Sequence, residues 1–156
     1  MNLRGTWQNS LRILGHLVLA NVATLLCKSL KVRIFNEDSV KKLKQENKNY
    51  IVAFWHGTML YPWYLHGNPS FAALTSKSRD GELLAPIVLT GIGYKNKKIL
   101  STWDKFEIPY FFSSANIYYS KPVYVSEDLS YEETSEKIIE CENKLNELQK
   151  QAQEFD

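Results

Sequence analysis

A histidine and a carboxylate each follow an apolar stretch of this chain of 156 residues. His56 comes directly after the apolar run 50–55 and is followed by Gly57. Asp80 follows the apolar residues 71–74, within Ser76–Glu82. An unperturbed histidine has a pKa of about 6.5, so it can take up and return a proton near neutral pH. His56 is therefore predicted to be a general base, on a surface to which the fold can also bring Asp80.

The elements around these residues predict how they are positioned. Residues 50–55 and 71–75 are typical of buried strands, and the aromatic segment 59–65 between them is read as helical. Ser78 or Asp80 can cap a helix that runs through Glu82 to about Thr90. This order predicts a parallel α/β sheet, whose carboxyl edge would hold both His56 and Asp80. The simpler alternative is that His56 bonds to a backbone carbonyl and Asp80 only caps the helix.

The rest of the chain adds short strands and a long terminal helix. Residues 31–35, 117–119 and 123–125 are predicted strands, residues 39–46 a polar helix, and 91–94 a turn. Ser130 and Glu133 have the spacing of a capping box. An amphipathic helix should follow, with an apolar stripe formed by Ile138, Cys141, Leu145, Leu148, Ala152 and Phe155.

Size and cysteine content predict one compact domain without a disulfide framework. The chain is long enough for a core but too short for two domains of ordinary size. Cys27 and Cys141 lie far apart and match no metal or redox spacing, which favours a reducing compartment. We divide the chain into an apolar membrane-associating helix over residues 1–30 and an α/β domain over residues 31–156.

The charge distribution favours an anionic membrane surface. Residues 1–50 contain nine Lys and Arg against three acids, and residues 126–156 contain ten acids against three Lys. The nearly continuous apolar run 11–26 is too short for a full bilayer span, so it is expected to lie in one leaflet or to pack on the domain. A cleaved signal peptide is a weaker alternative, and solvated helix faces would also account for the charges.

Two other kinds of binding fit the sequence poorly. The basic residues are not interleaved with aromatic residues as in a nucleic-acid-binding module, and the acidic C-terminal helix would repel phosphate. A zinc site at His56 and His66 lacks further ligands at a useful spacing. We therefore expect neither a nucleic-acid partner nor a bound metal.

Four ordered blocks resemble a bacterial branch of the lysophospholipid acyltransferase superfamily that is catalogued as a domain of unknown function. The blocks are Trp55–Gly57, Ser76–Glu82, Ser101–Pro109 and Tyr118–Val123, and the N-terminal apolar helix also looks like that of the family. The resemblance implies an α/β domain at the cytoplasmic face of the bacterial inner membrane. Its activity would be the transfer of a fatty acyl group to a lipid hydroxyl, on a lysophospholipid or a lipid A type acceptor. The acyl donor would be a thioester of coenzyme A or of an acyl carrier protein, with no bound cofactor.

The resemblance also assigns roles to residues. His56 would deprotonate the acceptor hydroxyl, and a carboxylate would orient its ring. The wider superfamily has that carboxylate where this chain has Tyr61, so the resemblance leaves Asp80 as the substitute. The predicted substrate-binding residues are Gly57, Lys77, Ser78 and Arg79, with Lys77 or Arg79 meeting a phosphate of the acceptor.

This chain departs from the family pattern in its middle. At Tyr94–Asn96 it passes directly to the C-terminal portion of the family domain, without the Arg-Gly-Ser-Ser and Asp-Gly-Pro-Arg-Gly-Pro blocks that would form the acceptor-phosphate site and a second wall. The predicted fold is therefore an incomplete acyltransferase-like sheet flanked by helices. The missing middle counts against catalysis. The alternative function is an inactive remnant that binds a membrane or a partner through its N-terminal helix and its aromatic residues.

Overall fold

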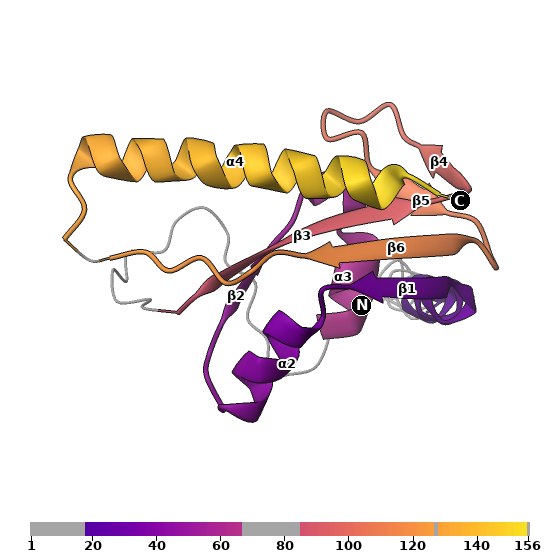
Figure 1. The fold of residues 1–156 in the computed structure, drawn as a ribbon. Coiled ribbons are helices and arrows are strands. Elements are labelled where there is room, and N and C mark those ends of the chain that lie inside the picture. Colours follow the sequence, from indigo (N-terminus) through magenta and orange to yellow (C-terminus); the bar gives the residue numbers. More distant parts are fainter. Residues whose placement is uncertain (1–17, 67–84, 127, 156) are drawn as a thin grey trace, which may run out of the picture.

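A four-stranded sheet forms the centre of the computed structural model, which describes residues 18–66, 85–126 and 128–155. Its strand order is β1-β6-β3-β2, with β1 at Lys31–Phe35, β6 at Ser114–Tyr119, β3 at Ile87–Tyr94 and β2 at Ile51–Ala53. Strands β4 (Lys97–Ile99) and β5 (Glu107–Pro109) form a separate antiparallel pair. The chain is thus of the mixed α/β class (Figure 1).

The sheet is mixed, which corrects the prediction of a parallel sheet. The pairs β1–β6 and β2–β3 are parallel, but β3 and β6 are antiparallel, with Ile92 opposite Ile117. The antiparallel pair arises because the chain returns through the β4–β5 hairpin instead of crossing over a helix.

Strand β3 is the largest departure from the sequence prediction. Its first half, Ile87–Thr90, was expected to end a helix, and Gly91–Tyr94 was expected to be a turn. All eight residues are strand, and seven of them are buried. Five of the eight are apolar or aromatic and four are β-branched, a composition that suits a strand covered on both faces better than a helix. The predicted strand 71–75 and the start of the predicted helix lie outside the described residues.

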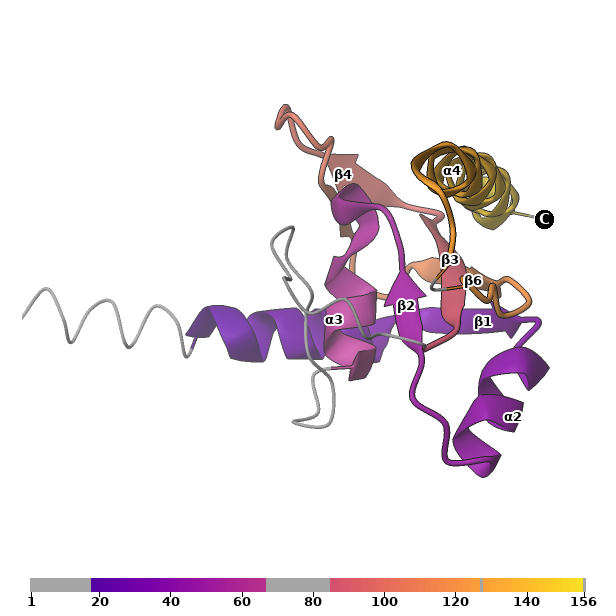
Figure 2. The ribbon, with the colours of Figure 1, turned by 90° about the vertical axis from the view of Figure 1, so that its left-hand side faces the viewer.

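The two faces of the sheet carry different packing layers. One face packs against the helix over residues 18–29, α2 (Asp38–Gln45) and α3 (Leu60–His66). Val88, Ile92 and Tyr94 of β3 point to this side. The other face packs against α4 (Tyr131–Gln153), where Leu89 meets Leu145 and Leu148. Figures 1 and 2 show α4 and α3 on opposite sides of the central strands. The predicted helix 39–46 and strand 31–35 are confirmed, within one residue at each end.

Helix α4 begins with the predicted capping box. The Ser130 hydroxyl accepts from Glu133 N, and the Glu133 carboxylate accepts from Ser130 N. Leu145, Leu148 and Ala152 of the predicted stripe are buried, but Ile138 is exposed. The stripe therefore packs against the sheet only over the C-terminal part of the helix.

Two glycines of β3 allow α4 to pack against the backbone of the strand. A Cβ on Gly91 would lie 2.2 Å from the carbonyl oxygen of Leu148, and one on Gly93 would lie 2.0 Å from that of Ala152. The Gln149 side chain then bonds to both backbone groups of Ile92, donating to its oxygen at 2.7 Å and accepting from its nitrogen at 3.1 Å. Helix α4 therefore satisfies polar backbone groups of β3 that a neighbouring strand would otherwise satisfy.

The N-terminal helix is described over residues 18–29 and packs through one side. Leu26, Cys27 and Leu30 at its end are buried, whereas Val18, Leu19, Val22 and Leu25 are exposed. Within the described parts of the chain, none of the helices combines the length and apolar character needed to cross a bilayer. Cys27 and Cys141 are both free thiols.

Candidate functional site

His56 stands at the start of a short helical turn directly after β2. The chain leaves β2 at Ala53, and the 3-10 helix η1 runs over His56–Thr58. Thr58 N and the Thr58 hydroxyl both donate to the Trp55 carbonyl, at 3.0 and 3.1 Å. These bonds fix the turn that presents the imidazole beyond the carboxyl end of the strand. The side chain of His56 is 57% exposed, as expected for a group that meets a substrate.

One tyrosine of strand β3 forms hydrogen bonds with the backbone of this turn and of the helix that follows it. The buried Tyr94 hydroxyl donates to the Thr58 carbonyl at 3.1 Å and accepts from Tyr61 N at 3.2 Å. It thereby joins η1 to the start of α3. Burial raises the pKa of Tyr94 far above its usual value, so the hydroxyl stays neutral and remains a donor.

Removing that hydroxyl should loosen the His56 turn. In Tyr94→Phe, two backbone groups lose their bonds inside the core, which should lower the free energy of unfolding by about 1–3 kcal/mol. Urea denaturation measures this loss. Tyr110→Phe, at an exposed tyrosine, is the matched control and should leave the stability unchanged. An unchanged stability in Tyr94→Phe would contradict the role given to this hydroxyl.

Asp104 is the acidic partner that the structure places beside His56. Asp104 Oδ2 lies 2.7 Å from His56 Nδ1, although 48 residues separate the two in sequence. The Asp104 side chain is only 7% exposed. Because an ionised carboxylate can only accept, this contact places the proton of a neutral imidazole on Nδ1 and leaves Nε2 to accept another. The geometry is that of a base and its orienting acid.

The loop between β4 and β5 positions Asp104. Lys105 N donates to the Thr102 carbonyl at 3.1 Å, and Phe106 N donates to the Thr102 hydroxyl oxygen at 3.2 Å. A hydrogen bond from Thr102 and a second from His56 hold the pKa of Asp104 below its ordinary value, against the opposing effect of desolvation. Asp104 is therefore an anion near neutral pH, as an orienting carboxylate must be.

Gly57 has a structural role at this site. A Cβ on Gly57 would lie 2.4 Å from the backbone oxygen of Asp104 and 3.4 Å from that of Lys105. Glycine is therefore required for the Asp104 loop to approach the His56 turn. The prediction that Gly57 touches substrate is compatible with this role, since the residue also lines the cavity described next.

His56 and Asp104 line a cavity of about 260 Å³. The Trp103 ring stacks against the His56 ring, with centroids 5.6 Å apart. Lys105 supplies a cationic side chain. Residues from η1, the loop before β5, and α4 complete the wall, and the full lining is Trp55, His56, Gly57, Thr58, Trp103, Asp104, Lys105, Glu107, Gln149 and Gln153.

Glu107 also lines this cavity, and one of its two carboxylate oxygens is buried without a hydrogen bond among the residues that the structure describes. This oxygen is Oε2, whereas Oε1 accepts from Lys97 Nζ at 2.7 Å.

The remaining predicted site residues lie outside the described residues. They are Lys77, Ser78, Arg79 and Asp80, so their roles stay predictions. Tyr61, at the position where the resemblance implies a carboxylate, is buried in the core, and burial raises the pKa of its hydroxyl. It therefore cannot serve as an anionic partner of His56. Within the described ranges, no group of three or more His, Cys, Asp and Glu side chains is arranged to hold a metal ion.

Comparison with known proteins does not identify a relative of this chain. Scans of family models, curated proteins and solved structures find no match to the chain. The functional argument therefore starts from the His56–Asp104 pair and its cavity.

Proposed function

We propose that this chain transfers a fatty acyl group from a thioester carrier to a lipid hydroxyl. The observation that carries the proposal is the exposed His56 ring, with Nδ1 held by Asp104 at 2.7 Å and a cavity beside it. A neutral imidazole oriented in this way is suited to remove a proton from a hydroxyl group. The sequence resemblance to lysophospholipid acyltransferases supports the choice of hydroxyl acceptor and thioester donor.

The proposed reaction requires two proton transfers at His56. Nε2 takes the proton of the acceptor hydroxyl while its oxygen attacks the thioester carbonyl. Asp104 stabilises the imidazolium that forms. The tetrahedral intermediate then collapses, the carbon–sulfur bond breaks, and the thiolate takes the proton back from Nε2. The products are an ester and a free thiol, and His56 returns to its starting state.

Other residues of the cavity have supporting roles in this proposal. The cationic side chain of Lys105 is suited to stabilise the oxyanion of the tetrahedral intermediate. Asp104 takes the orienting role that was expected of Asp80. Lys77, Ser78 and Arg79 remain proposed contacts for the acceptor phosphate, as Gly57 does for the substrate.

The second candidate is a remnant that binds membranes without catalysis. The two blocks of the family pattern that the sequence lacks, and the exposed apolar side chains of the N-terminal helix, favour it. Both candidates place the protein at the cytoplasmic face of a bacterial inner membrane, with lipid as partner. They differ only in whether the His56 site catalyses acyl transfer.

An acyl-transfer assay distinguishes the two candidates. Purified protein is incubated with a long-chain acyl-coenzyme A or acyl carrier protein thioester and with lysophospholipid or lipid A type acceptors in mixed micelles. We expect release of free thiol and formation of an ester product in equal amounts, and both should fall to background in His56→Ala. Lys144→Ala, at an exposed residue of α4, is the control and should keep full activity. Equal rates for wild type and His56→Ala would overturn the proposal.

A further inference from the structure

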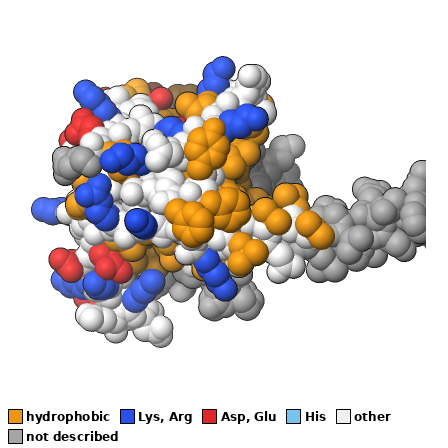
Figure 3. Space-filling view, turned by 90° about the vertical axis from the view of Figure 1, so that its right-hand side faces the viewer, with side chains coloured by type: hydrophobic (Ala, Val, Ile, Leu, Met, Phe, Trp, Pro, Cys, Tyr) orange, Lys and Arg blue, Asp and Glu red, His pale blue; other side chains and the backbone are white. Residues whose placement is uncertain are grey.

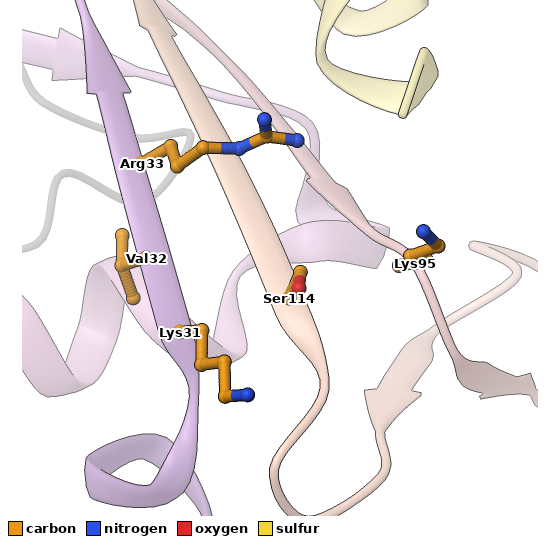
Figure 4. Close-up of a pocket in the computed structure, with 5 residues that line it drawn as sticks. All are labelled: Lys31, Val32, Arg33, Lys95 and Ser114. Carbon is orange, nitrogen blue, oxygen red and sulfur yellow. The ribbon is translucent and has the colours of Figure 1, made fainter. Parts of the chain in front are cut away.

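A second, strongly basic cavity lies at the end of the sheet where β1 and β6 begin. Its volume is about 360 Å³, and it is lined by Lys31, Val32, Arg33, Lys95 and Ser114 (Figure 4). Three of these five residues are cations and none is acidic. The parallel register places Lys31 opposite Ser114, and Lys95 N donates to the Ser114 carbonyl at 2.9 Å. The fold thus brings Lys95 close to two cations of β1, Lys31 and Arg33.

A buried asparagine positions the central cation of this cavity. Arg33 Nε donates to Asn116 Oδ1 at 3.1 Å. Asn116 is 1% exposed, and its Nδ2 donates to the Glu154 carbonyl at 3.0 Å. Figure 4 shows the guanidinium reaching across β6 toward the side on which Lys95 lies, with Lys31 on the other side of Ser114. A guanidinium fixed through Nε presents its terminal nitrogens as a planar fork, which matches the oxygens of a phosphate group.

An exposed apolar surface adjoins the cavity. Val18, Val22, Leu25 and Ser29 recur at spacings of four and three, so they share one side of the N-terminal helix. The Ser29 hydroxyl accepts from Phe112 N at 3.1 Å, which places the loop before β6 at the end of this side.

That loop carries aromatic side chains into solvent. Phe111 and Phe112 are 51% and 74% exposed, and they directly precede Ser113 and the cavity residue Ser114. Figure 3 shows hydrophobic side chains gathered on this end of the molecule, next to lysines and arginines. Apolar and aromatic side chains beside cations match the two zones of a lipid surface, its acyl boundary and its charged headgroups.

We propose that this end of the molecule docks on an anionic membrane. The phosphate of an anionic lipid occupies the Lys31–Arg33–Lys95 cavity, while Phe111, Phe112 and the exposed side of the N-terminal helix enter the acyl boundary. The positive charge of the cavity favours a membrane that contains anionic lipid over one that contains only lipids without net charge. The docking does not depend on acyl transfer, because no residue of the His56 cavity takes part in it.

Vesicle sedimentation tests the proposal with the full chain. Phosphatidylcholine vesicles with and without phosphatidylglycerol are compared. We expect clear binding only with the anionic lipid, and a loss of binding as salt is raised. In Lys31→Gln/Lys95→Gln, the partition coefficient should fall roughly twenty-fivefold, since each cation near the headgroups contributes roughly fivefold. The charge-matched control Lys137→Gln/Lys144→Gln, on α4, should change it less than about twofold.

Two further arms separate the phosphate contact from the apolar contact. Phe111→Ser/Phe112→Ser should weaken vesicle binding while leaving the folded state intact by circular dichroism. Titration with inorganic phosphate should compete with vesicles for the wild type but not for Arg33→Gln. Equal binding to both vesicle types, or equal losses in the cavity variant and the α4 control, would overturn the proposal. Binding of inorganic phosphate by a protein that ignores anionic vesicles would also overturn it.

Discussion

Asp104→Asn should lower the rate of acyl transfer by roughly 10³- to 10⁴-fold, although the side chain keeps its size. The neutral amide can donate to His56 Nδ1, which would move the imidazole proton to Nε2 and block the nitrogen that must act as base. It also removes the negative charge that stabilises the imidazolium. The rate with saturating thioester and acceptor is the measurement, because the change acts on the chemical step.

The matched control and the double variant make this test specific. Asp38→Asn removes the same charge from the exposed first turn of α2 and should leave the rate unchanged. His56→Ala/Asp104→Asn should be no slower than His56→Ala alone, because Asp104 acts through the histidine. Independent, multiplying losses in the double variant would show that the two residues do not work as a pair.

Gly93→Ala should produce the largest loss of stability, about 3 kcal/mol or more. The new methyl group would lie 2.0 Å from the backbone oxygen of Ala152, and a backbone atom cannot move aside by changing rotamer. Helix α4 would have to lift away from β3, which would also strain the bonds between Gln149 and Ile92. Against a total of about 5–15 kcal/mol for a typical domain, this loss would be readily measured by urea denaturation.

Gly91→Ala should behave in the same way, because its methyl group would lie 2.2 Å from the Leu148 oxygen. Lys98→Ala, at an exposed position of β4, is the control and should stay within about 0.5 kcal/mol of wild type. A midpoint for Gly93→Ala equal to that of the control would contradict the close packing of α4 on β3.

The place of His56 just after a strand could be predicted from the sequence because its signal is local. A continuous apolar run ends at Trp55, and such a run is typical of a buried strand whose end reaches the surface. The C-terminal helix is predicted for the same reason, since the capping box and the apolar spacing both act within a few residues. The stripe was extended too far at Ile138, because spacing alone does not show where the sheet beneath the helix ends.

Asp104 could not be assigned from spacing, because its position depends on contacts between distant segments. It reaches His56 only after β4 and β5 pair and after the loop between them packs on Gly57. A signal was present in the family-like block Ser101–Pro109, where Asp104 lies beside the aromatic residue Trp103. The sequence interpretation uses this block only as a mark of family resemblance, so it predicts no role for Asp104.

The sequence does not predict strand β3, because its two glycines fit either a turn or a strand that a helix approaches closely. The spacing of Gly91 and Gly93 predicts a turn, the usual role of closely spaced glycines. In the structure neither glycine has a positive φ, and both serve the close approach of α4. Only the partner helix, more than fifty residues later in the chain, distinguishes the two readings.

The tautomer of His56 tests the central claim most directly, and it requires no knowledge of the substrate. Nitrogen-15 NMR of the neutral imidazole distinguishes a protonated Nδ1 from a protonated Nε2. We predict that Nδ1 carries the proton in the wild type and that the equilibrium shifts toward a protonated Nε2 in Asp104→Asn. A proton on Nε2 in the wild type, or identical ring spectra in both proteins, would contradict the proposal that Asp104 prepares His56 as a base.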